Sequence, residues 1–205
     1  MTAPASIAAS CGVDALIHAM EAYVSNFASP FSDAMAEKAM ELIGGNLRRF
    51  VANRKDEEAA CAMMVGSTFA GMAFAWAKLG NVHAMSHPVS AYFHVPHGVA
   101  NAVFLPTVIE FNAPADYQKH ADVARYLGVD TSGMSVEEAA LAAADALAKL
   151  CRDVDIPKFN ELPGVDPADF EALSIAAEKN VSTPSNVREI TAADFLQLFR
   201  KAYEL

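Results

Sequence analysis

A chain of 205 residues is long enough to bury a hydrophobic core, and 53% of its residues are hydrophobic while 20% are charged. This balance excludes an intrinsically disordered chain and is typical of one globular domain. The net charge of −10 and the pI near 4.9 exclude a nucleic-acid backbone or an anionic membrane surface as partner. The three cysteines are far apart in sequence, and the N-terminus lacks a signal-peptide pattern. We therefore expect reduced thiols in a cytoplasmic protein.

The first predicted helix spans about residues 12–26, where apolar side chains recur at three- and four-residue steps. A lead-in of small residues at 4–10 precedes it, and a Ser-Pro pair at 29–30 is expected to end it. Asp14 and His18 are four residues apart in this helix, so they lie on one face.

Ser32 and Asp33 can cap a second helix that runs toward Phe50. A third helix, from Ala59 to Ala77, carries no charged residue and is nearly long enough to span a bilayer. Because it is rich in Ala, Gly, Ser and Thr, we expect instead a fully buried helix that neighbouring helices approach closely.

The rest of the chain continues the helical pattern. Ser135 and Glu138 form a capping-box pattern. The further helices are expected at 98–112, at 121–127, from Ser135 to Cys151, after Asp166-Pro167, and after Thr191. Alternating strand patterns, dinucleotide-binding glycine motifs and Walker loops do not occur in the sequence. The sequence therefore predicts an all-α helical bundle.

Histidines concentrate between residues 81 and 98, in a stretch that contains no charged residue. Pro88 must open or kink a helix in this stretch, and Pro96 separates off a new element. Imidazole is the commonest metal ligand in proteins, and its pKa is easily tuned near neutral pH. The stretch holds four of the six histidines of the chain: His83, His87, His94 and His97.

Asp14 and His18 on one helix, joined by His83 and His97 from the later stretch, could point at a single ion. Imidazole and carboxylate suit Fe(II), Zn(II) or Ni(II), with bonds of roughly 2.0–2.2 Å. The competing interpretation of His18 is a core histidine that only forms a hydrogen bond. His94 has an aromatic and an aliphatic neighbour, so we expect it to pack and leave it outside the ligand set.

Two motifs resemble those of the iron-containing (group III) alcohol dehydrogenases: D-A-L-I-H-A-M-E-A-Y at 14–23 and H-A-M-S-H-P-V-S-A-Y-F-H-V-P-H-G at 83–98. Residue types and internal spacing agree in both, and the resemblance runs weakly on to the C-terminus. It implies that residues 1–205 form one domain, the helical metal-binding domain of dehydroquinate synthase-like type that ends these enzymes.

The resemblance also implies roles for individual residues. His87 resembles the family's residue near the nicotinamide and the reacting carbon, which implies a cofactor contact and a proton relay. Phe74 resembles a position that lines the substrate pocket. The metal ligands of the family, taken from the first motif's Asp and His and the second motif's first and last His, correspond to Asp14, His18, His83 and His97.

The chain also departs from the family. Members are about twice as long and begin with an α/β nucleotide-binding domain that carries a G-G-G-S motif, so this chain resembles their C-terminal half. Trp76 stands where relatives tend to carry Asn, and we expect it to pack between helices rather than to narrow the pocket. The segment 183–189 only loosely matches the family's N-P-R segment, and we assign it no role.

The activity that the resemblance implies is reversible oxidation of an alcohol to an aldehyde or ketone with NAD or NADP, assisted by Fe(II) or by Zn or Ni in its place. We expect the isolated chain to be inactive without a nucleotide-binding domain and to form a homo-oligomer. Two other classes stay open: a helical metal-dependent hydrolase, and a non-catalytic helical module with a structural metal. The His-Asp dipeptide typical of helical phosphohydrolases does not occur.

Overall fold

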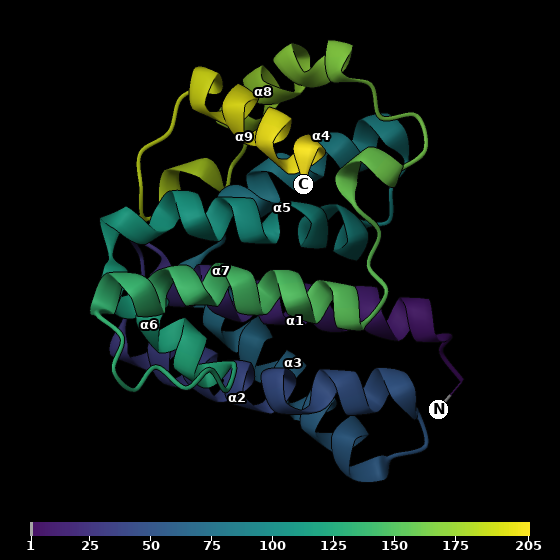
Figure 1. Ribbon diagram of the computed structural model, residues 1–205, viewed down its shortest axis with the longest axis vertical. Helices are drawn as coiled ribbons and strands as arrows, with labels where there is room; N and C mark the ends of the chain where they lie inside the picture. Colours follow the sequence, from purple (N-terminus) through teal and green to yellow (C-terminus); the bar gives the residue numbers. More distant parts are fainter. Residues whose placement is uncertain (1) are drawn as a thin grey trace.

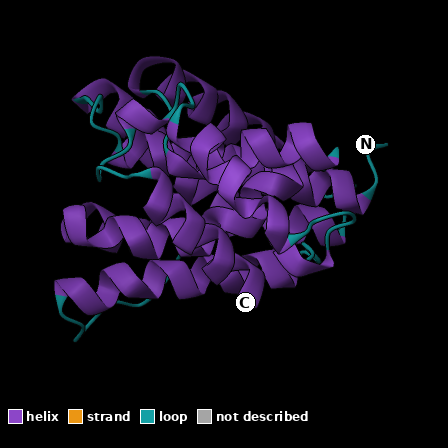
Figure 2. Ribbon diagram, turned by 90° about the horizontal axis from the view of Figure 1, so that it is seen from above, coloured by secondary structure: helices purple, strands orange, loops and turns teal. Residues whose placement is uncertain are grey.

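The computed structural model describes residues 2–205, and these contain nine α-helices, four short 3-10 helices and no strand (Figures 1 and 2). The prediction of an all-α fold is confirmed. The α-helices are α1 (Ala5–Val24), α2 (Pro30–Ala52), α3 (Glu57–Ala77), α4 (Asn81–Phe93), α5 (His97–Asn112), α6 (Tyr117–Tyr126), α7 (Val136–Asp153), α8 (Phe170–Glu178) and α9 (Ala192–Glu204). The 3-10 helices are η1 (Ala113–Ala115), η2 (Phe159–Glu161), η3 (Pro167–Asp169) and η4 (Thr183–Ser185).

The helices are stacked in layers, with α1 and α5 in the middle (Figure 1). On one side α2 and α3 pack along each other and against α1. On the other side α5 contacts α4 and α9, and α8 packs on both α4 and α9. The central position of α1 matters for function, because its Asp14 and His18 thereby lie half-buried among the helices that surround α1.

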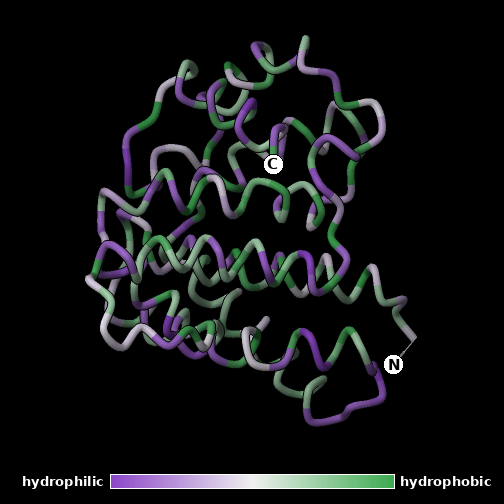
Figure 3. The backbone as a smooth tube through the Cα atoms, viewed as in Figure 1, coloured by the Kyte–Doolittle hydropathy of each residue, from purple (hydrophilic) through white to green (hydrophobic). Residues whose placement is uncertain are grey.

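One hydrophobic core runs from α1 to the C-terminal helices. Hydrophobic residues follow the central helices, whereas the turn between α2 and α3 is hydrophilic (Figure 3). Aromatic rings join α5 to α8 and α9, and aromatic pairs of this kind stabilise by about 0.5–1.5 kcal/mol beyond their buried area. Their centroids are 4.7–6.3 Å apart, and the rings belong to Phe104, Phe159, Phe170 and Phe199.

The first helix begins at Ala5, so the predicted start near residue 12 is wrong, and most of the lead-in of small residues belongs to the helix. Alanine has the highest helix propensity of all residues, and three alanines lie among the first five positions of α1. The helix ends at Val24 because Ser25 is extended and its hydroxyl donates to the carbonyl oxygens of Ala77 (2.5 Å) and Ser185 (3.1 Å). The first contact ties the end of α1 to the end of α3, and the second ties it to η4.

The helix α2 starts earlier than predicted, with Ser29 as its cap in place of Ser32. The Ser29 hydroxyl accepts the Ser32 N–H at 3.3 Å, and the Ser32 hydroxyl accepts the Ser29 N–H at 2.8 Å. Pro30 occupies the first helical position, where a missing N–H has no consequence. The Ser-Pro pair therefore opens α2 rather than ending α1. The caps predicted at Ser135 and Thr191 are confirmed as reciprocal capping boxes.

The helix α3 is buried along one face only, so the prediction of a fully buried helix is wrong. A Cβ on Gly66 would lie 2.7 Å from Cγ1 of Ile43, which shows how closely α2 approaches this face. The opposite face exposes Met64 (71%) and Trp76 (69%) to solvent. The small residues of α3 that are buried are Ala59, Ala60, Gly66, Ala70, Ala73 and Ala77.

Trp76 does not pack between helices as expected. It lies on the open face of α3 and contacts Phe31 edge to face, with ring centroids 5.8 Å apart.

By length and hydropathy alone, α1 and α3 could each span a membrane. Of the most apolar 18-residue stretch in each helix, 78% is buried inside the protein in α1 and 33% in α3.

The histidine stretch folds into α4 and α5, joined by a short turn. The helix α4 continues through Pro88, so Pro88 does not open a helix, and His83 and His87 lie one turn apart. His94 ends α4 in a left-handed conformation (φ 56°) and is exposed, so the packing predicted for it is wrong. The helix α5 begins at His97, directly after Pro96 and one residue before the predicted start at residue 98.

Candidate metal centre

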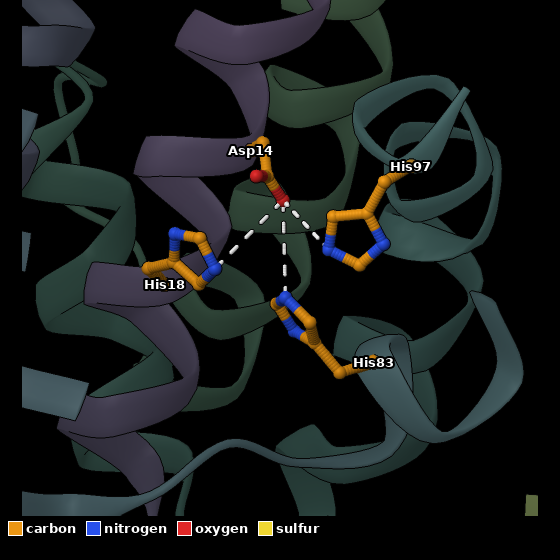
Figure 4. A group of neighbouring side chains, drawn as sticks. All are labelled: Asp14, His18, His83 and His97. Carbon is orange, nitrogen blue, oxygen red and sulfur yellow. Dashed lines mark ion pairs between the residues drawn. The ribbon is translucent and has the colours of Figure 1, made fainter. Parts of the chain in front are cut away.

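Three helices bring the predicted metal ligands together (Figure 4). Oδ1 of Asp14 lies 3.9 Å from Nε2 of His18, 3.8 Å from Nε2 of His83 and 3.7 Å from Nε2 of His97. All four ligand atoms lie within 4.8 Å of one another. Bonds of about 2.1 Å in a tetrahedral site place ligand atoms roughly 3.4 Å apart, so a small contraction would close this set around one ion.

The donor set fits a divalent metal of intermediate softness. Three imidazoles and one carboxylate leave a bound divalent ion with a net positive charge, which is the condition for polarising an oxygen atom. Burial lowers the pKa of His18 and of His97, although the Asp14 carboxylate opposes the shift in both. Both rings are therefore neutral at neutral pH and can offer a lone pair to a metal.

Close helix packing makes this convergence possible. Asp14 and His18 project from one face of α1, since they are four residues apart. His97 is the first residue of α5, and Gly98 follows it. A Cβ on Gly98 would collide with the carbonyl group of Ser10 in α1. Only glycine lets the start of α5 approach α1 closely enough for His97 to reach Asp14.

Glu21 belongs to the site, although sequence reasoning missed it. Its Oε2 lies 2.5 Å from Nδ1 of His83, and its Oε1 accepts the Val82 N–H at 2.6 Å. A carboxylate only accepts hydrogen bonds, so Nδ1 of His83 carries the proton and Nε2 turns its lone pair toward Asp14. The signal in the sequence was the spacing: Glu21 follows Asp14 by seven residues, which places both on one face of α1.

Asn101 is the second residue that sequence reasoning missed. It is fully buried on α5, one turn after His97. Its Nδ2 lies 2.6 Å from Oδ1 of Asp14, 3.1 Å from Nε2 of His83 and 3.0 Å from Nε2 of His97. Its Oδ1 is buried without a hydrogen-bond partner. An NH₂ group has two protons, so the amide can donate to two of these three acceptors at a time, and it would compete with a metal for their lone pairs.

His87 lies beside the four ligand atoms rather than among them. Its ring stacks on His97, with centroids 5.5 Å apart, and meets His83 edge to face at 5.7 Å. Its Nδ1 lies 3.0 Å from Nδ2 of Asn180, a residue far away in sequence. Burial is the main cause that lowers the pKa of His87, and the neighbouring histidines add to it. The ring is therefore neutral near neutral pH.

Phe74 forms a wall of the site. Its ring stacks on the ring of His18, with centroids 4.6 Å apart and planes inclined by 29°. Beyond Phe74 an open cleft of about 450 Å³ is lined by residues that include Lys78 and Val181. The position predicted to line a substrate pocket thus lies between a candidate ligand and an open cleft.

The segment 183–189, which has no sequence-based assignment, fastens the C-terminal part of the chain to the histidine helices. Oδ1 of Asn186 accepts Nδ2 of Asn112 at 2.9 Å and the Asn81 N–H at 3.2 Å. In return Nδ2 of Asn186 donates to Oδ1 of Asn112 at 2.8 Å. Asn81 begins α4 and Asn112 ends α5, so this one amide holds both helices that carry the histidines.

Comparison with known proteins finds a family and relatives that match nearly the whole chain. Residues 8–203 match the family described as "Fe-containing alcohol dehydrogenase family, C-terminal". The chain is 44% identical over 200 residues to lactaldehyde reductase from Escherichia coli strain K12, covering 98% of this chain and 52% of that protein. It is 42% identical over 200 residues to 1,3-propanediol dehydrogenase from Citrobacter freundii, with the same coverage. The chain spans about half the length of these relatives.

Solved structures show the same fold. A crystal structure of 1,3-propanediol oxidoreductase superimposes with a TM-score of 0.96 at 41% identity, covering 98% of this chain and 53% of that one. An alcohol dehydrogenase from Oenococcus oeni gives a TM-score of 0.96 at 37% identity, covering 98% of this chain and 52% of that one. The chain therefore belongs to the iron-containing alcohol dehydrogenase family and matches its C-terminal helical domain.

Proposed function

We propose that this chain is the metal-binding part of an NAD(P)-dependent alcohol dehydrogenase that interconverts alcohols with aldehydes or ketones. The observation that carries the proposal is the convergence of one carboxylate and three imidazoles from α1, α4 and α5. The relatives support the reaction class, since they include a lactaldehyde reductase and a 1,3-propanediol dehydrogenase. A relative from Bacillus methanolicus, 40% identical, is an NAD-dependent methanol dehydrogenase.

The ion would be held by Asp14, His18, His83 and His97. The family description favours Fe(II), and Zn(II) or Ni(II) could take its place. A bound divalent ion supplies Lewis-acid stabilisation of negative charge on the substrate oxygen. Glu21 orients His83 for this task, because it fixes the ring by a hydrogen bond at 2.5 Å.

His87 and Phe74 would serve the substrate and the nicotinamide. His87 lies next to His97 and is neutral near neutral pH, so it can pass a proton to or from the substrate oxygen. Phe74 presents an apolar ring beside His18, which suits the carbon chain of a small alcohol and keeps water from that side.

The activity of the whole protein belongs to the same proposal. Residues 1–205 act as one domain, and a nucleotide-binding domain binds NAD or NADP against it. The substrate is a small alcohol or aldehyde, the assembly is a homo-oligomer, and the compartment is the cytoplasm. Relatives about twice as long support the need for a second domain, since this chain covers 52% of the lactaldehyde reductase.

Metal analysis tests the ligand set. The purified chain, loaded with Fe(II) without oxygen or with Zn(II), is expected to bind about one ion, and His83→Ala and His97→Ala are expected to lose it. His94→Ala is the matched control, since His94 lies in the same stretch but is exposed and outside the cluster. Full occupancy in both ligand variants would refute the assignment. Ester hydrolysis by the loaded chain, lost in His83→Ala, would point to the hydrolase class instead.

A further inference from the structure

The contact between His87 and Asn180 joins α4 to the loop that follows α8. Nδ2 of Asn180 lies 3.0 Å from Nδ1 of His87. Among the described residues, the His87 ring forms no other hydrogen bond. Whatever fixes the Asn180 amide therefore also decides which nitrogen of His87 carries the proton.

The orientation of the Asn180 amide follows from its second partner. Its Oδ1 accepts the N–H of Ser182 at 3.0 Å. A backbone N–H can only donate, so the amide oxygen must face Ser182, and the opposite orientation would place two donors against each other. The NH₂ group then faces His87 and donates to Nδ1. A ring nitrogen that accepts a hydrogen bond carries no proton, so the proton of the neutral ring is on Nε2.

The loop that carries Asn180 is anchored on both sides, which makes the orientation a fixed feature. The Asn180 N–H donates to the Ala177 carbonyl at 3.0 Å, and the Asn180 carbonyl accepts the Thr183 N–H at 3.1 Å. The Thr183 hydroxyl also donates to the Ala177 carbonyl at 2.7 Å. Ser185 donates to the Leu79 carbonyl at 2.6 Å, which ties the loop to the start of α4.

His83 shows the opposite arrangement one helical turn away. There Glu21 accepts a hydrogen bond from Nδ1, so the proton is on Nδ1 and Nε2 presents a lone pair. A lone pair suits a metal ligand, whereas an N–H suits a group that donates a proton or a hydrogen bond. Two neighbouring histidines of α4 are thus given different chemistry by residues from distant parts of the chain.

We propose that Asn180 is a positioning residue that holds His87 in the tautomer protonated on Nε2, so that His87 donates to the substrate oxygen and stays out of the metal's ligand set. The role as a donor rests on the function proposed above, but the tautomer itself does not. The two statements can therefore fail independently.

Long-range ¹H–¹⁵N spectra of the ¹⁵N-labelled chain report which ring nitrogen of each histidine is protonated. They are recorded metal-free and with diamagnetic Zn(II), near pH 8, where free histidine is neutral. For His87 we expect the proton on Nε2. In Asn180→Asp the new carboxylate can only accept, so we expect the proton to move to Nδ1 and the two ¹⁵N resonance positions to exchange. In Asn180→Ala we expect a mixture of both tautomers.

Asn46→Asp is the matched control, because it makes the same change on α2, where the Asn46 amide bonds only its own helix, namely the Leu42 carbonyl and the Arg49 guanidinium. It is expected to leave the His87 spectrum unchanged. A proton on Nδ1 in the parent chain would overturn the proposal, as would an unchanged tautomer in both Asn180 variants. Zn(II) content is measured in parallel. If the parent chain binds no Zn(II), the proposed metal site is refuted, but the tautomer assignment is unaffected.

Discussion

The Glu21 carboxylate accepts a hydrogen bond from Nδ1 of His83 at 2.5 Å, in a place where neither side chain is more than 3% exposed. Glu21 is held in turn by the Val82 N–H, next to His83 in the chain. Carboxylates in this position orient a metal-binding imidazole and make it a stronger base. The pair therefore prepares His83 before any ion is present.

Glu21→Gln is expected to lower the metal affinity of the chain by about 10- to 100-fold, the usual range for such partners. A glutamine has one accepting oxygen where Glu21 satisfies two donors, so either His83 or Val82 loses its partner. Competition with a chromophoric chelator measures the change. Glu41→Gln, an exposed change on α2, is the control. An affinity equal to that of the parent chain would show that Glu21 has only a structural role.

Gly98→Ala is expected to destabilise the chain by about 1–3 kcal/mol, since the new methyl group would meet the Ser10 backbone, which cannot rotate away. Metal affinity should fall too, because α5 must move and His97 moves with it. Gly71→Ala is the matched control: nothing lies within 4 Å of its Cβ position on α3. That change should stabilise by about 0.5–1 kcal/mol. Urea unfolding measures the stability of both variants. A Gly98→Ala variant as stable as the parent chain would contradict the close approach of α5 to α1.

His120 is expected to make the metal-free chain less stable in acid. It is fully buried, its Nδ1 donates to the Asp116 carbonyl at 2.7 Å, and its Nε2 has no partner. Burial lowers its pKa below the ordinary 6.5. As the pH falls through about 6.5, the His120 imidazole is therefore protonated in the unfolded chain but stays neutral in the folded chain. The free energy of unfolding therefore falls as the pH drops below about 6.5, down to the lowered pKa.

His120→Gln isolates this contribution, because the other histidines with lowered pKa remain. Between pH 7.5 and pH 5, the variant should lose less stability than the parent chain, by up to about 1.4 kcal/mol for each pH unit. Urea unfolding at several pH values gives both slopes. Parallel slopes would mean that His120 is protonated in the folded state as readily as in the unfolded one.

The purified chain is expected to show no alcohol-dependent reduction of NAD or NADP, even with Fe(II) supplied without oxygen. Its sequence contains no G-G-G-S motif for binding phosphate. Holding the nicotinamide against the substrate contributes a large part of the rate enhancement, so catalysis is not expected without it. Absorbance of the reduced nicotinamide is the measurement, with a full-length family member as positive control. Turnover that disappears in His83→Ala would disprove the expectation and place a cofactor site on these residues.

The sequence predicted those features that depend on local pattern. The helical fold, the caps at Ser135 and Thr191 and the new element after Pro96 follow from spacing and from a few residues each. The fold also brings Asp14 near His97, as the two motifs together implied.

The features that the sequence did not predict depend on contacts between distant segments. The wrong prediction for α3 arose because its small residues indicate close packing without saying on how many sides. Glu21 and Asn101 follow candidate ligands at helical spacing, but only the fold shows that one reaches His83 and the other reaches atoms of three candidate ligands. Asn180 has no local signal at all, since its partner lies 93 residues away.

The amide of Asn101 has a consequence for the energetics of the cluster. Its Nδ2 lies within hydrogen-bonding distance of Asp14, His83 and His97, and its two protons can serve two of these three acceptors at a time. Buried acceptors left without a donor are costly, so this amide offsets part of the cost of packing α1, α4 and α5 together. An ion held by the same three atoms would have to displace a buried amide, and this displacement would lower its affinity.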